Sequence, residues 1–233
     1  MKIALIRKDY LYSSGGAERY VYNLSHELAK SGHEVHIFAN RWEPPRKSDI
    51  KIHYVPLIKV NSPVKNLSFV INLRKKLSFN SFDIVHSFSH VYPSDIYRMG
   101  DGIHKLWLKI ETPSLYLRFF KYLNPRHLAI LFLESQIFRE GNYKKIVANS
   151  KLCYKQAQKY FNIPKEKLAI IYNGVDHKIF NPEVRERYFK KMRLKLGIDD
   201  KTLVILYISD GFILSDVTRS AFTAMPDTDL FCP

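Results

Sequence analysis

GGAERYVYNLSHELAKSGHEVHIFAN, residues 15–40, decides how the rest of the chain folds. KIALIR at residues 2–7 is a short apolar run, which is typical of a strand covered on both faces. Gly15 and Gly16 then allow a tight turn into an amphipathic helix, and Gly32 is placed to end that helix. Because residues 35–39 again have a strand pattern, the stretch predicts a strand–helix–strand unit.

The start of this helix is a candidate anion site. The first backbone N–H groups of a helix have no partner within it, and the helix dipole places positive charge at the same point. However, Gly15 and Gly16 lack the full GxGxxG spacing, and a Gly-Gly turn before a helix is also common as plain chain geometry. From the residues alone, both interpretations remain open.

Composition bounds the class of protein. A chain of 233 residues with 46% hydrophobic residues is long and apolar enough for one large α/β domain, or for one and a half smaller ones. Cys153 and Cys232 are its only cysteines, so we expect neither a disulfide framework nor a zinc site, and a reducing compartment. We also expect no signal peptide and no membrane-spanning helix.

The net charge of +15 implies an anionic partner, such as a membrane surface, a phosphorylated acceptor or a nucleic acid. Basic and aromatic residues interleave within residues 105–126, a mixture that suits the surface of an anionic bilayer. The membrane-binding candidates are Lys105, Trp107, Lys109, Arg118 and Lys121. A pair of core-facing helices with solvated lysines is the alternative.

The remaining pattern predicts a Rossmann-like, doubly wound and mainly parallel α/β sheet with its ligands at the carboxyl ends of the strands. The further strands are expected at 50–57, 82–87, 144–148, 168–172 and 203–208, and the further helices at 64–77, 128–141, 151–161 and 183–196. His86 and His90 lie where the strand 82–87 ends. Their spacing would align metal ligands on a helix but not here, so we favour histidines that line an acceptor site or pack, and we expect no metal.

The stretch GGAER…LSHELAKSGHEVHIF resembles the opening of the GT-B glycosyltransferases of family 4, most closely the lipopolysaccharide-core sugar transferases. NGVD at 173–176, followed by FNP at 180–182, resembles a second segment of that family. The resemblance implies an N-terminal Rossmann-like acceptor-binding domain over 1–180, a connector helix over 181–201 and a truncated start of the donor-binding domain over 202–233.

The resemblance also implies the chemistry. A family member moves a sugar from a nucleotide-sugar to a glycan or glycolipid acceptor, with retention at the anomeric carbon and without a metal cofactor. Gly15, Gly16 and Ala17 would offer N–H groups to the diphosphate and the sugar, Asp101 would orient a hydroxyl group, and Asn173 would contact the substrate. Asp101 can equally be a residue that shapes a Gly-Asp-Gly turn. The implied location is the cytoplasmic, inner face of the membrane, as a peripheral protein.

The chain departs from the family after residue 208. Relatives continue with an arginine and a Lys-Gly pair that hold the donor diphosphate, whereas residues 209–216 contain no lysine, and no E-x7-E segment follows. We therefore expect the chain as given to be inactive. A non-catalytic partner subunit is the alternative function, and a basic nucleic-acid-binding module is a further one. Because no nucleic-acid motif is recognisable, we expect no nucleic-acid partner.

Overall fold

The computed structural model describes residues 1–45, 49–100, 102–112, 114–199 and 201–204. Packing divides the chain into two compact units, Met1–Asn173 and a second that begins at Gly174. The predicted strand–helix–strand unit is confirmed as β1 (Lys2–Ile6), α1 (Gly16–Lys30) and β3 (Glu34–Ala39). Gly32 follows the end of α1 with a φ of +83°, a left-handed conformation that costs glycine little.

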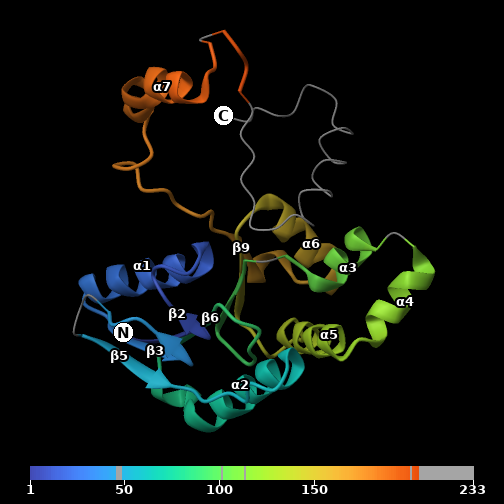
Figure 1. The fold of residues 1–233 in the computed structure, drawn as a ribbon. Coiled ribbons are helices and arrows are strands. Elements are labelled where there is room, and N and C mark those ends of the chain that lie inside the picture. Colours follow the sequence, from blue (N-terminus) through green and yellow to red (C-terminus); the bar gives the residue numbers. More distant parts are fainter. Residues whose placement is uncertain (46–48, 101, 113, 200, 205–233) are drawn as a thin grey trace. The chain divides into compact units, whose positions relative to one another are not determined.

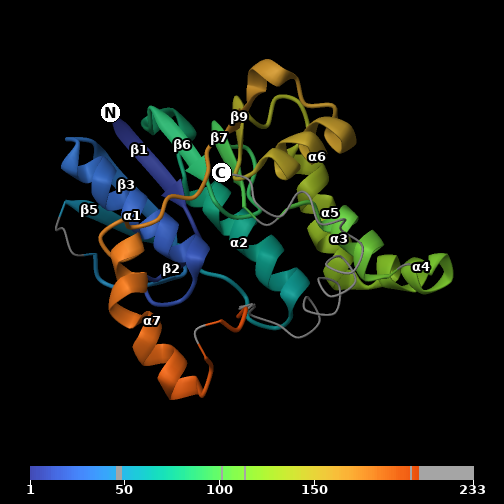
Figure 2. The ribbon, with the colours of Figure 1, turned by 90° about the horizontal axis from the view of Figure 1, so that it is seen from above.

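The first unit is built on a parallel sheet of seven strands, in the spatial order β5, β3, β1, β6, β7, β8 and β9. Figure 1 shows the sheet between its helices, and Figure 2 shows most of these strands side by side in this order. Its remaining strands are β5 (Ile50–Tyr54), β6 (Ile84–Ser87), β7 (Ile96–Met99), β8 (Lys145–Ala148) and β9 (Leu168–Ile170). In register, Leu5 of β1 lies between Ile37 of β3 and His86 of β6. The strand order therefore reverses at β1, and sheets of this kind bind ligands beside such a reversal.

The apolar run of β1 is explained by burial on both faces. Ile3 and Leu5 pack in one cluster with Val21 of α1, and their neighbours Ala4 and Ile6 pack in another. That second cluster contains residues of α2 (Ser62–Lys76). Figure 1 shows α1 and α2 on opposite sides of the sheet at β3, the strand next to β1. Because successive side chains of a strand alternate between faces, both faces of β1 require apolar residues.

The other helices of the first unit begin at recognisable caps. They are α3 (His104–Glu111), α4 (Leu115–Leu123), α5 (Pro125–Ile137) and α6 (Lys151–Phe161), with short 3-10 turns at Phe79–Ser81 and Lys165–Lys167. The predicted cap of α6 is confirmed, because the Ser150 side chain accepts from the N–H of Cys153. α5 begins earlier than expected, since Asn124 caps it and Pro125 suits a first helical position. None of the described helices is long and apolar enough to cross a membrane.

Two features of the sheet were not predicted. Residues 96–99 form β7 in the interior of the sheet, although their sequence IYRM places an arginine in the strand. Residues Asp9–Tyr10 (β2) and Arg41–Trp42 (β4) form a small parallel pair just beyond β1 and β3. Both features lie at or near the carboxyl edge, where the ligand-binding residues of a parallel sheet gather.

The second unit contains the predicted charged helix, α7 (Pro182–Leu196). Asn181 caps its start, and Gly197 ends it with a φ of +66°. The strand expected at 203–208 falls largely outside the described residues, as does the rest of the segment up to residue 233. The domain boundaries expected at 180 and 201 therefore stay predictions.

The buried face of α2 allows a test of the packing. Leu73 is fully buried, whereas Ile71, two residues earlier on the same helix, is 54% exposed. Replacing Leu73 by alanine removes apolar contacts and leaves a cavity, so we expect the free energy of unfolding to fall by about 2–5 kcal/mol. The control Ile71→Ala should lower it by less than about 1 kcal/mol in urea unfolding. Equal losses in the two variants would contradict the assigned faces of α2.

Candidate active site

A cavity of about 320 Å³ opens at the carboxyl edge of the sheet, beside β1, where the strand order reverses. Four of the residues predicted to bind substrate line it: Gly16, Ala17, His90 and Asn173. Gly15 is the N-cap of α1, directly before the lining residues of that helix. Asp101 lies outside the described residues, and Gly100 before it lines the cavity.

The two glycines have different reasons for lacking a side chain. Gly15 is fully extended, with φ −178° and ψ 176°, so the expected tight turn does not need a glycine backbone. A Cβ there would instead lie 2.8 Å from a carboxylate oxygen of Glu18. A Cβ on Gly16 would meet no atom within 4 Å, and Gly16 faces the cavity. Glycine at position 16 therefore leaves space for a ligand next to the helix start.

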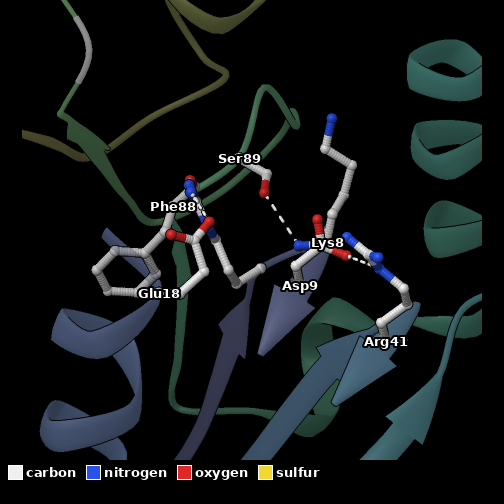
Figure 3. Close-up of polar contacts among 7 residues, drawn as sticks. Lys8, Asp9, Glu18, Arg41, Phe88 and Ser89 are labelled. Atoms are coloured by element: carbon white, nitrogen blue, oxygen red, sulfur yellow. Dashed lines mark hydrogen bonds and ion pairs between the residues drawn. The ribbon is translucent and has the colours of Figure 1, made fainter. Parts of the chain in front are cut away.

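The first turn of α1 is joined to the loop after β6 through Arg7. The Arg7 guanidinium pairs with Glu18 at 2.5 Å and donates to the backbone oxygen of Phe88, also at 2.5 Å. Both charged side chains are only 17% exposed. Figure 3 shows Glu18 and Phe88 approaching each other from these two elements. Because Arg7 neutralises Glu18, the acidic residue does not cancel the positive end of the helix.

The other charged residues after β1 are paired as well. The Lys8 ammonium group donates to the Asn66 side chain at 2.6 Å, and its backbone N–H donates to the Ser89 hydroxyl at 3.2 Å. Asp9 pairs with Arg41 at 2.6 Å, a contact drawn in Figure 3 with that of Ser89. These contacts hold the loops after β1, β3 and β6 together around the cavity.

Arg98 is a further charged residue of the cavity. It lies on β7, is only 7% exposed and lines the cavity. Its guanidinium donates to the Asn173 side chain at 2.5 Å and to the Tyr20 hydroxyl at 3.3 Å, and it stacks over the Tyr20 ring at 3.9 Å. No carboxylate of the described residues pairs with it. A buried cation held only by neutral groups is costly, and an anionic ligand would offset that cost.

His86 lies behind this site. Its ring packs on Phe88 with centroids 4.0 Å apart, and its Nε2 is shielded without a hydrogen-bond partner among the described residues. Burial, and then the positive charge of Arg98, lower the pKa of His86 to about 3. His86 is therefore a neutral imidazole at pH 7. His90, the other predicted histidine, lines the cavity, whereas His86 does not.

Asn149 is a further residue that the sequence prediction missed. It lines the cavity, and its side-chain amide donates to the backbone oxygen of Gly100 at 2.8 Å. Its side-chain oxygen is buried and has no partner within the described part of the chain. Asn149 directly follows β8, so its position after a parallel strand was the signal that could have identified it. No group of three or more histidines, cysteines and carboxylates among the described residues could hold a metal ion.

The structure places the five predicted membrane-binding residues on two helices. Lys105, Trp107 and Lys109 lie on α3, and Arg118 and Lys121 lie on α4. The Arg118 guanidinium donates to the backbone oxygen of Thr112 at the end of α3, with distances of 3.0 and 2.9 Å. Lys121 pairs with Glu111 at 2.7 Å. These two residues of α4 thus join the helices to each other.

The electrostatics of the cavity can be tested on His86. The charge of Arg98 disfavours protonation of the imidazole, so Arg98→Gln should raise the pKa of His86 above about 3. Burial, the larger cause, should still keep it below the ordinary value near 6.5. NMR titration of the histidine ring signals measures this pKa. Arg74→Gln is the control, because Arg74 stacks on Tyr92 elsewhere, and an unchanged pKa in Arg98→Gln would contradict the arrangement.

Comparison with known proteins identifies a relative with a similar sequence. Lipopolysaccharide glucosyltransferase WaaG of Escherichia coli (strain K12) is 24% identical over 220 residues, which cover 92% of this chain and 56% of that protein. The chain thus spans about half the length of this curated relative.

Two solved structures share the fold. A crystal structure of WaaG, described as a glycosyltransferase involved in lipopolysaccharide biosynthesis, matches with a TM-score of 0.67 and 21% identity, over 86% of this chain and 52% of that one. Sucrose-phosphate synthase from Thermosynechococcus elongatus matches with a TM-score of 0.57 and 16% identity, over 89% and 55%. The doubly wound sheet is therefore the GT-B type of fold.

A model of a protein family also matches this chain. That model, Glycosyltransferase Family 4, matches residues 14–179, which include α1, the loop after β6, β7 with Arg98 and Asn173. The matched range thus contains both the helix start and the buried arginine of the cavity. The chain belongs to Glycosyltransferase Family 4.

Proposed function

We propose that this chain is the acceptor-side part of a glycosyltransferase that moves a sugar from a nucleotide-sugar to a glycan or glycolipid acceptor. The observation that carries the proposal is the cavity in which the start of α1 and the guanidinium of Arg98 face the same space. WaaG is named as a glucosyltransferase, and its crystal structure is described as that of a glycosyltransferase, which supports sugar transfer. The name of WaaG supports a lipopolysaccharide-core or another cell-surface acceptor.

The proposed chemistry is mainly electrostatic. As the bond to the sugar breaks with retention, negative charge develops on the leaving diphosphate and positive charge on the sugar ring. The first N–H groups of α1 and the Arg98 guanidinium are fixed donors for that negative charge, and fixed donors need little reorganisation during the reaction. This scheme requires no metal ion. Asp101 stays a proposed residue for orienting a hydroxyl group, next to the cavity-lining Gly100.

We further propose that these 233 residues do not complete the transfer alone. The described cavity offers a diphosphate one helix end and one guanidinium that no carboxylate of the described residues neutralises. Losing even one such donor typically slows an enzyme by about 100- to 1000-fold. A non-catalytic partner subunit would have the same binding cavity. The two functions predict different results only when the chain is assayed for sugar transfer together with a donor-binding partner.

Nucleotide-sugar binding tests the cavity. Isothermal titration with UDP-glucose should show weak binding that falls about 10- to 100-fold in Arg98→Gln, because a charge-assisted hydrogen bond to phosphate is lost. Gly16→Ala should weaken binding through the added methyl group while leaving the melting temperature unchanged or raised, since alanine is the better helix former. The control Arg74→Gln removes the same charge elsewhere. An affinity for UDP-glucose that is unchanged in both Arg98→Gln and Gly16→Ala, or sugar transfer by the chain alone, would contradict these proposals.

Membrane docking is the second part of the proposal, at the inner face of the cytoplasmic membrane. α4 exposes large apolar side chains: Tyr116 at 71%, Phe119 at 61%, Phe120 at 53% and Leu123 at 55%. Lys105 and Lys109 are exposed on the neighbouring α3. Exposed aromatic groups beside basic ones fit the interface of an anionic bilayer.

Liposome sedimentation tests this docking. The double variant Phe119→Ser, Phe120→Ser should lose most binding to vesicles that contain anionic lipid, and salt should weaken binding of the unaltered chain. Arg118 and Lys121 are poor targets because they join α3 to α4. Leu194→Ser with Leu196→Ser is the matched control, since both leucines are exposed on α7. Binding that does not depend on anionic lipid, or that persists in the phenylalanine variant, would contradict the proposal.

A further inference from the structure

A second cavity of about 290 Å³ adjoins the first. It lies between α3 and α5, and His90 lines both cavities. Its wall includes an aromatic ring, two imidazoles and one buried carboxyl group, from Trp107, His104, His127 and Glu134, and Arg126 also lines it. The diphosphate-binding scheme uses none of these four side chains, and the membrane-docking prediction shares only Trp107 with them.

The two imidazoles form a hydrogen-bonded pair. His104 Nε2 lies 2.9 Å from His127 Nδ1, and the rings stack with centroids 5.0 Å apart. Burial first, and then nearby positive charges, lower the pKa of both, that of His104 to about 4. Both rings are therefore neutral at pH 7, and one proton lies between them. Whichever ring donates it, the two outer nitrogens comprise one donor and one acceptor, which matches hydroxyl groups.

Trp107 adds an apolar surface beside this pair. Its ring stacks on His104 at 5.4 Å with an interplanar angle of 16°, and Trp107 remains 39% exposed. The negative face of an aromatic ring attracts the slightly positive C–H groups of one face of a pyranose ring. An aromatic platform next to a hydroxyl-matching pair is suited to a sugar.

Glu134 lies deepest in the wall. It is 3% exposed, and its Oε1 accepts the backbone N–H of His104 at 2.6 Å, so one oxygen caps α3. The backbone N–H of Lys105 also acts on this carboxyl group, but Oε2 is shielded and makes no geometrically sound hydrogen bond among the described residues. Burial raises the pKa of Glu134 to about 7, although the backbone N–H groups of His104 and Lys105 lower it. A buried carboxyl oxygen without a partner is costly. Because Glu134 lines the cavity, a small rotation of its side chain would present Oε2 to a ligand hydroxyl group, which would supply that partner.

We propose that this second cavity is a saccharide subsite that binds one pyranose ring of the acceptor, with the ring on Trp107 and its hydroxyl groups at His104, His127 and Glu134. The statement that the bound sugar belongs to the acceptor rests on the proposed function, whereas the binding of a sugar in this cavity does not. Because His90 lines both cavities, a glycan seated here reaches toward the anion site beside α1. The competing explanation is that the cluster only fastens α3 to α5.

The test uses the fluorescence of Trp107. The chain has two tryptophans, so Trp42→Phe leaves Trp107 as its only fluorescent tryptophan. In this background, methyl α-glucopyranoside and maltose should change the emission in a saturable way. His127→Phe keeps a ring in place but removes both nitrogens, and it should weaken binding about ten-fold. His177→Phe is the control, because His177 is exposed in the second unit.

A second measurement does not depend on the His127→Phe variant and is therefore informative even if that variant fails to fold. Saturation-transfer NMR on methyl α-glucopyranoside should show contact with the protein that is lost in Trp107→Leu. No saccharide response in either assay overturns the proposal. So does saturation by inorganic phosphate alone, which would make the cavity an anion site, or a response to UDP-glucose without one to the free sugars. Saccharide binding without any nucleotide-sugar binding would retain the subsite and reject the proposed function.

Discussion

The burial of β1 on both faces is the constraint on which the first unit depends. Leu5 and Ile6 are adjacent in the chain, point to opposite faces and are fully buried. Burying side chains of this size contributes about 1.5–3 kcal/mol each, so β1 is fixed in the middle of the sheet with helices on both sides. Arg7 follows the carboxyl end of β1, and its guanidinium contacts Phe88 in the loop after β6 and Glu18 in the first turn of α1. The cavity therefore depends on the same strand as the core.

Much of this architecture could be predicted from the sequence, because the signals were local. The apolar run at 2–7, the glycine at position 32 and the serine at 150 each specify a strand or a helix end through nearby residues. The doubly wound fold follows from the alternation of such elements. Helix starts at Asn61 and Asn124 shifted by a few residues because the caps and prolines, rather than the apolar pattern, set them.

The decisive part of the cavity was not predictable in the same way. IYRM at β7 is too short and too polar to identify as an interior strand, yet Arg98 in it is neutralised by no carboxylate among the described residues. Its partners Tyr20 and Asn173 are more than 70 residues away in the chain, so only the folded sheet brings them together. His86 and His90 illustrate a smaller limit: both flank one strand end, but one packs and the other lines the cavity.

The parallel sheet also separates the molecule into two edges with different practical uses. The amino edge holds contacts such as Lys144 with Asp95 at 2.8 Å and the Lys2 backbone with Asp83 at 2.6 Å, while the ligand cavity opens at the carboxyl edge. The Lys144 side chain is 79% exposed at this amino edge. A dye, a spin label or a linker to a sensor surface attached at Lys144 would therefore leave the mouth of the cavity clear for ligand.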